Sequence, residues 1–212
     1  MLFSLRAFKP YRMSCVHFEG EEDYMTSLSH KFVFLLLTVF ASVALLAQHD
    51  QAAGKQPPKS PPAEASVSVN GKTISIKYSS PSVKGRQIFG PGGLISHDPN
   101  YPVWRAGANA ATALHTDADL QIKDLSVPKG DYTLFVDVSN PDAWTLVVSK
   151  DTGEWGLAYK KDKDLGRVAM DMSKPSAPVE QLKYTLAEDG SGKAKLTLAW
   201  ENHEASVPIT VK

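Results

Sequence analysis

The sequence predicts an all-β fold, a single antiparallel β-sandwich, and three observations lead to it. Apolar and polar residues alternate with a period of two in most runs that follow Ser66. Turn residues separate these runs at short intervals. No window after Ser66 sustains a 3.6-residue period over about ten residues, so no long helix is expected. A flattened β-barrel fits the same pattern and is the alternative.

Length and charge limit the class of protein. The chain has 212 residues, 42% of them hydrophobic and 22% charged, which suits one globular domain with an appendage. The formal net charge is zero at pH 7, which gives no global argument for a nucleic-acid partner, although a local basic patch stays open. We therefore expect no nucleic-acid binding.

The amino-terminal region, residues 1–47, is expected to be a signal segment rather than part of the fold. Lys31 precedes an apolar run (32–47) of 16 residues, which suits a signal peptide better than the roughly 20 residues of a membrane span. The mature chain would begin near Gln48 and be periplasmic or secreted, and Met25 is a second candidate start. In the alternative, the uncleaved run anchors the protein to the inner membrane, the only membrane contact that the sequence suggests.

Cysteine usage agrees with export. The single cysteine, Cys15, precedes the expected cleavage site, so the mature chain would carry no disulfide and no thiolate metal ligand. Residues 48–65 are rich in proline and polar residues, which favours a disordered linker. The folded domain is then expected to cover residues 66–212.

The first expected element of the domain is a β-hairpin. The runs SVSV and KTISIKY flank Asn70 and Gly71, and an Asn-Gly pair between alternating runs is the strongest short hairpin pattern. This register places Val67 opposite Ile74, with both on the buried face.

The later runs repeat the alternation up to a last strand with Val207, Ile209 and Val211. The residues expected to face the core are Leu134, Val136, Leu146, Val148, Leu196 and Leu198. The residues expected to face outward are Thr133, Asp137, Thr145 and Thr197.

A long stretch from Pro81 to Thr112 interrupts the strands, and a functional site is expected there, because structureless segments longer than about 12 to 15 residues are often functional. The candidate ligand-binding residues are Arg86, Trp104, Arg105 and Asn109. An arginine fork suits a carboxylate or phosphate, and a tryptophan face stacks on a sugar or an arginine. In the structural interpretation, Trp104 is core, an arginine stacks on it and Asn109 caps a turn.

Several sequence blocks together resemble one bacterial family. The blocks YSSPSVKGRQIFG, VWRAGANAAT, DLSVPKGDYTLFV, WTLVVSKDTGEWG and APVEQLKYTL occur in this order and resemble Domain of Unknown Function 2911 over residues 66 to 210. The resemblance implies an exported, β-rich domain without an established activity. An acidic residue usually follows the WR-x-GAN block of the family, and Ala110 occupies that place here.

A hydrolase built from carboxylates or histidines near residues 81–117 is the alternative function. A metal site would use His97 and His115, although solvated histidines explain the same residues. A glycosidase needs two carboxyls about 5 to 10 Å apart. Its candidates are Asp98, Asp117, Asp119, Asp137 and Glu154.

The sequence is therefore interpreted as an exported, non-catalytic binding or envelope-interaction module. No catalytic residue is assigned and no cofactor is expected, because the sequence shows no Gly-x-Ser-x-Gly elbow and its GPGGLIS run lacks the lysine of a phosphate-binding loop. The expected ligand is an anionic or carbohydrate component of the envelope. Arg86 and Arg105 are expected to converge on one site, with Asp98 or Glu154 as the partner if their role is structural.

Overall fold

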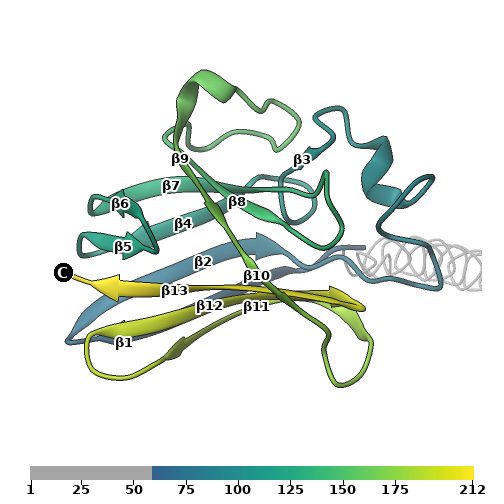
Figure 1. Ribbon diagram of the computed structural model, residues 1–212. Coiled ribbons are helices and arrows are strands. Elements are labelled where there is room, and N and C mark those ends of the chain that lie inside the picture. The colour runs from purple at the N-terminus through teal and green to yellow at the C-terminus, as the bar shows by residue number, and fades with distance from the viewer. Residues whose placement is uncertain (1–58) are drawn as a thin grey trace, which may run out of the picture. The chain divides into compact units, whose positions relative to one another are not determined.

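The computed structural model describes residues 59–212, so the expected signal segment and residues 48–58 of the expected linker lie outside the described residues. The described residues form two antiparallel sheets, of seven and six strands, packed face to face around one core (Figure 1). Neither sheet closes into a barrel within this part of the chain. The β-sandwich prediction is confirmed, and the barrel alternative is excluded.

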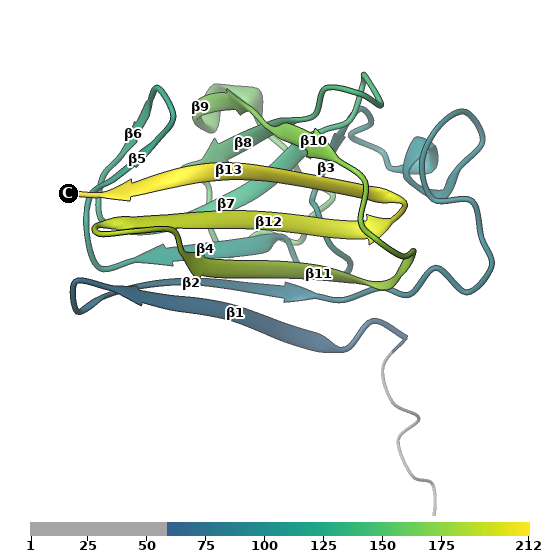
Figure 2. The ribbon, with the colours of Figure 1, turned by 60° about the horizontal axis from the view of Figure 1, so that its bottom comes forward.

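The strands of the seven-stranded sheet are β1 (Pro62–Val69), β2 (Lys72–Ser79), β3 (Val103–Trp104), β4 (Thr112–Thr116), β7 (Gly130–Asp137), β8 (Thr145–Ser149) and β9 (Asp164–Ala169). Their order is β1-β2-β4-β7-β8-β9, with β3 paired to β7. The strands of the six-stranded sheet are β5 (Leu120–Ile122), β6 (Leu125–Val127), β10 (Asp171–Ser173), β11 (Val179–Glu188), β12 (Lys193–Glu201) and β13 (His203–Val211). Their order is β11-β12-β13-β5-β6, with β10 paired to β13. Figure 2 shows β12 and β13 in front of β4 and β7.

The predicted hairpin is present between β1 and β2. Asn70 and Gly71 have φ angles of 52° and 73°, as a two-residue hairpin turn with two left-handed residues requires. Val67 pairs with Ile74, so the predicted register is confirmed.

Strand β1 begins at Pro62, inside the stretch that was expected to be linker. Ala63 and Ala65 pair with Tyr78 and Ile76 and pack against the core. These alanines continue the alternation of the strand, but their small side chains on either side of Glu64 give a weak apolar pattern. The first strand therefore begins at Pro62, four residues before the expected start of the folded domain at Ser66.

The core alternation is confirmed for every residue expected to face inward. Leu134, Val136, Leu146, Val148, Leu196 and Leu198 are each at most 2% exposed. Among the residues expected outside, Asp137, Thr145 and Thr197 are half-buried. Thr133 was expected to be exposed and is not, because the segment after β8 folds back over it and its hydroxyl donates to the Asp151 carbonyl at 2.6 Å.

The segment after β8 covers part of the outer face of the seven-stranded sheet. Phe135 and Val147 point away from the main core and form a second cluster with Val103, against which Tyr159 packs. The Phe135 and Tyr159 ring centroids are 5.0 Å apart. Arg167 holds this cover in place, because it donates hydrogen bonds to the Tyr159 hydroxyl and to carboxylates of β7 and β9.

The long stretch from Pro81 to Thr112 lies at one end of the sandwich, at the right of Figure 1, and includes the short 3-10 helix η2 (Leu94–His97). Phe89 anchors it, since its ring contacts Trp104, Trp144 and Trp200 at centroid distances of 6.0, 4.8 and 5.9 Å. A second 3-10 helix, η3 (Lys161–Lys163), lies in the cover of the outer face. Among the described helices, none has the length and apolar character to cross a membrane.

Candidate functional site

A groove of about 830 Å³ lies on the outer face of the seven-stranded sheet, over β2, β4 and β7. Small side chains, among them Ser75 and Ala113, leave this space open. The charged side chains that line the groove are Lys77, His115, Asp131 and Glu154. The groove therefore offers hydrogen-bond donors and acceptors of both charges.

The strand register brings these side chains together. Alternate residues of β2, β4 and β7 face away from the core, and the sheet pairs them in rows. One row is Ser75, His115 and Asp131, and the next is Lys77, Ala113 and Thr133.

One wall of the groove comes from the segment that follows β8. The Ala111 amide donates to the Glu154 carbonyl at 3.3 Å, and Ala110 pairs with Trp155 in an isolated bridge. Thr152 and Gly153 line the groove beside Glu154. The open part of the sheet face is thus bordered by the same segment that covers its other part.

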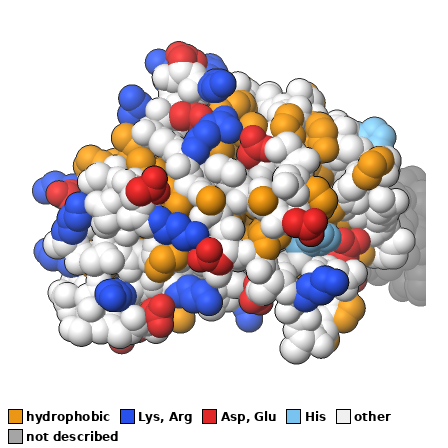
Figure 3. Space-filling view, in the orientation of Figure 1, with side chains coloured by type: hydrophobic (Ala, Val, Ile, Leu, Met, Phe, Trp, Pro, Cys, Tyr) orange, Lys and Arg blue, Asp and Glu red, His pale blue; other side chains and the backbone are white. Residues whose placement is uncertain are grey.

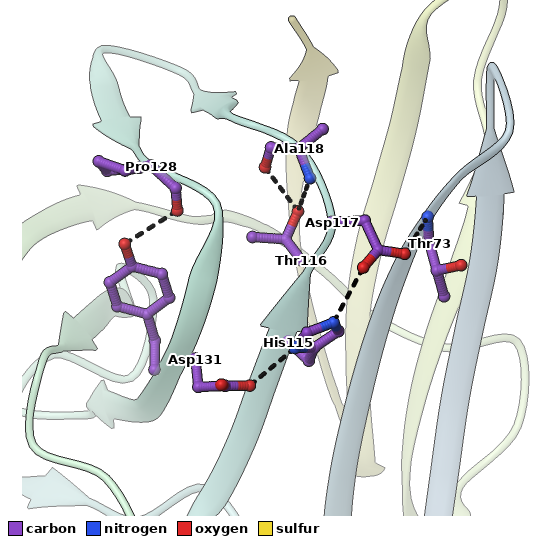
Figure 4. A network of polar contacts seen from close by, with 8 residues as sticks. Thr73, His115, Thr116, Asp117, Ala118, Pro128 and Asp131 are labelled. Atoms are coloured by element: carbon purple, nitrogen blue, oxygen red, sulfur yellow. Dashed lines mark hydrogen bonds and ion pairs between the residues drawn. The ribbon is translucent and has the colours of Figure 1, made fainter.

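His115 lies between two carboxylates (Figure 4). Its Nδ1 is 2.7 Å from Asp131 and its Nε2 is 3.2 Å from Asp117, which also accepts a hydrogen bond from the Thr73 amide. Hydrogen bonds to Asp131 and then to Asp117 raise the pKa of His115 above its ordinary 6.5. The bond from His115 lowers the pKa of Asp117 below 3.8. Both ring nitrogens therefore act as donors, which favours the imidazolium form.

The row of Ser75, His115 and Asp131 has the residue types of a nucleophilic triad, but not its hydrogen bonds. In a triad the serine hydroxyl bonds to the histidine nitrogen that the aspartate leaves free. Here that nitrogen, Nε2, bonds to Asp117 at 3.2 Å. A histidine held by two carboxylates has no lone pair to accept a serine proton, so the row is not arranged for this chemistry.

The structure separates the two histidines of the predicted metal alternative. His115 lines the groove, whereas His97 lines a second hollow and has its Nδ1 3.0 Å from the Gly93 carbonyl. Within residues 59–212, no group of three or more histidine, cysteine, aspartate or glutamate side chains has the arrangement of a metal site.

Two of the four predicted binding residues, Arg86 and Asn109, donate hydrogen bonds to other groups of the protein. Arg86 donates to the carbonyls of Val83 at 3.1 Å and Ser82 at 2.6 Å. Asn109 has a φ of 60° and donates from Nδ2 to the Ser79 hydroxyl at 3.4 Å. The Arg86 contacts lie within its own loop, whereas the Asn109 contact reaches the last residue of β2, so the turn-capping role expected for Asn109 stays a prediction.

The other two predicted binding residues, Trp104 and Arg105, line the second hollow, of about 240 Å³, without Arg86 or Asn109. Trp104 is 1% exposed, and its ring stacks on Trp200 at a centroid distance of 5.7 Å. Arg105 lies 3.7 Å from Asp98, the partner that the structural interpretation named. The structure therefore places one of the two arginines, Arg105, in the same hollow as Trp104. Ligand binding by these residues stays a prediction.

The candidate glycosidase carboxylates are mostly engaged in local contacts. Asp119 accepts a hydrogen bond from the Lys129 amide at 2.8 Å, and Asp137 pairs with Arg167 at 3.2 Å. Glu154 lines the groove together with Asp131, a residue that was not among the candidates. Asp131, like Lys77, was missed because its position on the outer face of a strand becomes meaningful only when the strands are paired.

Comparison with protein families agrees with this domain. Residues 60–209 match the model of the family described as "Protein of unknown function (DUF2911)". The chain belongs to this family. The predicted resemblance is therefore confirmed over almost all of the DUF2911 domain. No curated protein and no solved structure matches the chain. In this DUF2911 domain Ala110 lines the groove.

Proposed function

We propose that this domain is a non-catalytic binding module whose outer-face groove holds a neutral, hydroxyl-rich chain, such as a glycan of the cell envelope. The groove itself is the observation that supports the proposal. Its volume of about 830 Å³ falls within the usual range of about 300 to 1,000 Å³ for ligand sites. It lies on interior strands of a sheet, which hold its side chains in fixed positions.

The charges of the groove favour a neutral ligand over an anion. Lys77 and His115, whose pKa is raised, lie beside Asp131 and Glu154, so a strong anion would meet carboxylates as well as cationic groups. Hydroxyl groups donate hydrogen bonds to carboxylates and accept them from ammonium or imidazolium groups, so a hydroxyl-rich ligand can bond to the acidic and to the basic side chains of the groove. Positive and negative side chains are also interspersed over the face shown in Figure 3.

The sheet pairing weighs against an extended peptide added as an extra strand. Strand β2 pairs with β1 and β4, and β4 pairs with β2 and β7, so their backbone groups are already used within the sheet. Strand addition needs a free sheet edge. The ligand of the groove is therefore expected to be held by contacts other than strand pairing with β2 or β4.

We also propose that the domain works outside the inner membrane, where envelope glycans are found. Its support is the sequence alone, namely the apolar run 32–47 and the cysteine-free remainder of the chain. Retention of that run as an anchor would place the same domain at the membrane surface.

A hydrolase is the competing function, because Asp131 and Glu154 both line the groove. Against it, Asp131 is bonded to His115 and Glu154 lies 3.6 Å from Lys160, so neither carboxylate has the isolated, apolar surroundings of a general acid.

Calorimetric titration with neutral and anionic oligosaccharides tests the proposal. We expect neutral chains to bind without release of products. Lys77→Ala should weaken binding about tenfold, as loss of a hydrogen bond to a charged group does. Lys195→Ala, which removes an exposed strand lysine from the other sheet, is the matched control and should bind like the parent. Binding restricted to anionic chains contradicts the proposed ligand class, and accumulation of shortened chains assigns the hydrolase instead.

A further inference from the structure

The second hollow, of about 240 Å³, lies between the long stretch 81–112 and Trp200 of β12. Its walls are largely apolar and include the side chains of Pro81, Leu94, Ile95, Trp104 and Trp200. Its polar side chains are those of His97, Asp98 and Arg105. A hollow of about 240 Å³ has room for a group of several heavy atoms.

Two side chains of this hollow carry buried N–H groups without an acceptor. Trp200 is 1% exposed, and its Nε1 has no hydrogen-bond partner among the described residues. The Nε and Nη1 atoms of Arg105 are buried and equally without a partner in this part of the chain. Asp98 lies 3.7 Å from Nη1, too far for a hydrogen bond. Buried donors in native proteins ordinarily have a protein or water partner, and among the described residues the protein supplies no acceptor for these donors.

The neighbouring tryptophan shows that the missing acceptor is specific to Trp200 and Arg105. Trp104 lines the same hollow, and its Nε1 donates to the Gly107 carbonyl at 3.2 Å. The fold therefore provides an acceptor for one indole of the stacked pair and none for the other. The N–H donors without a partner belong to Trp200 and Arg105. These two residues are far apart in the sequence, but both line the hollow.

We propose that this hollow binds an acetamido group, the N-acetyl substituent of an amino sugar. The carbonyl oxygen of such a group accepts hydrogen bonds from Arg105 and Trp200. Its methyl group suits the apolar walls, and its N–H suits the Asp98 carboxylate. A carboxylate or phosphate fits less well, because Asp98 already offsets the guanidinium charge and would repel an anion.

The inference goes beyond the groove and does not depend on it, since an N-acetylated monosaccharide is small enough to use this hollow alone. The two sites are nevertheless neighbours in the chain. Gly107 and Ala108 line the hollow, whereas Ala110 and Ala111 line the groove. An N-acetylated glycan would join both proposals, and each can fail separately.

Nuclear magnetic resonance of the ¹⁵N-labelled protein tests the inference through the indole N–H groups. We expect N-acetylglucosamine to shift the Trp200 indole resonance and to leave that of Trp155, which lies outside the hollow and is 60% exposed, in place. Glucose, which lacks the acetamido group, should bind at least about tenfold more weakly. An unmoved Trp200 resonance at saturating N-acetylglucosamine overturns the inference, as does a shift caused by acetate and not by the acetylated sugar.

Variants of Arg105 provide the second readout. Arg105→Met keeps an unbranched apolar stem and removes the donors, so the affinity for N-acetylglucosamine should fall about tenfold. Arg105→Lys keeps the charge without the fork and should also weaken binding, which keeps the test valid if the methionine variant unfolds. Arg86→Met, at an exposed arginine outside the hollow, is the control. Parent affinity in both Arg105 variants contradicts the assignment of this residue.

Discussion

The two halves of the outer face of the seven-stranded sheet differ, although in both the alternation of side chains along each strand determines which residues point outward. Over β7 and β8, the outward residues Phe135 and Val147 are apolar, and the segment after β8 covers them through Tyr159. Over β2 and β4, the outward residues include Ser75 and His115, and the groove stays open. Strand pairing fixes which residues share a face, and their polarity decides whether another segment covers that face or leaves it open.

Thr133 lies at the boundary between these halves. Its side chain lines the groove, and its hydroxyl donates to the Asp151 carbonyl of the cover. The two halves thus meet at a hydrogen bond rather than at an apolar contact. Removing the cover should damage the covered half first and the groove only through its wall.

The largest expected effect comes from Phe135→Ala, which removes the centre of the covered half. We expect a loss of about 3 to 5 kcal/mol in the free energy of unfolding, as for other buried phenylalanines, measured by denaturant titration. Thr197→Ala, at a half-buried outward position of the other sheet, is the control and should change stability by less than about 0.5 kcal/mol. A loss below about 1 kcal/mol for Phe135→Ala contradicts the packed cover.

A smaller effect is expected from Arg167→Met, which removes the donor that joins the cover to the sheet. Arg167 bonds to Asp164, Asp137 and the Tyr159 hydroxyl and is only 32% exposed, so we expect a loss of about 1 to 2 kcal/mol. Limited proteolysis should then cut within residues 150–163. Lys123→Met, which breaks an exposed pair with Asp171, should cost less than about 1 kcal/mol. Equal stability losses in the two variants, without new cleavage, contradict the role of Arg167.

The smallest effect concerns the open half and depends on pH. The pKa of His115 is raised above 6.5, so its contribution to stability is complete below pH 6.5 and is lost as pH rises through the folded pKa. The pKa of Asp117 is lowered, so its contribution is lost only as pH falls below 3.8. Thermal unfolding from pH 5 to 9 should show a shallow decline in the parent that His115→Gln removes. A profile with the same slope in both proteins contradicts the imidazolium between two carboxylates.

The sequence predicts the hairpin and the buried set because both depend on local alternation and turn residues. The start of β1 was missed because Ala63 and Ala65 are weak markers of a buried strand face. The cover was missed because alternation places Phe135 on the outer face without showing what packs there. These limits have one physical cause. Alternation depends on neighbouring residues of a strand, whereas the segment that covers a sheet face comes from another part of the chain.

The candidate site was predictable only in part for a related reason. Trp104 and Arg105 are adjacent in sequence, and the structure places them in one hollow, whereas hydrogen bonds to its own loop turn Arg86 away. The groove was not predictable, because Lys77, His115 and Asp131 come from strands that are distant in the chain and meet only through their register.

The most direct test of the open half as a binding surface is a pair of tryptophan substitutions measured by calorimetric titration with a neutral oligosaccharide. Ala113→Trp fills the groove without removing a charged side chain, and Ala187→Trp places the same side chain at an exposed alanine of β11. We expect Ala113→Trp to weaken binding by more than about tenfold, or about 1.4 kcal/mol, at an unchanged melting temperature, while Ala187→Trp binds like the parent. Parent affinity in Ala113→Trp, or a parent that binds no neutral oligosaccharide, contradicts the account.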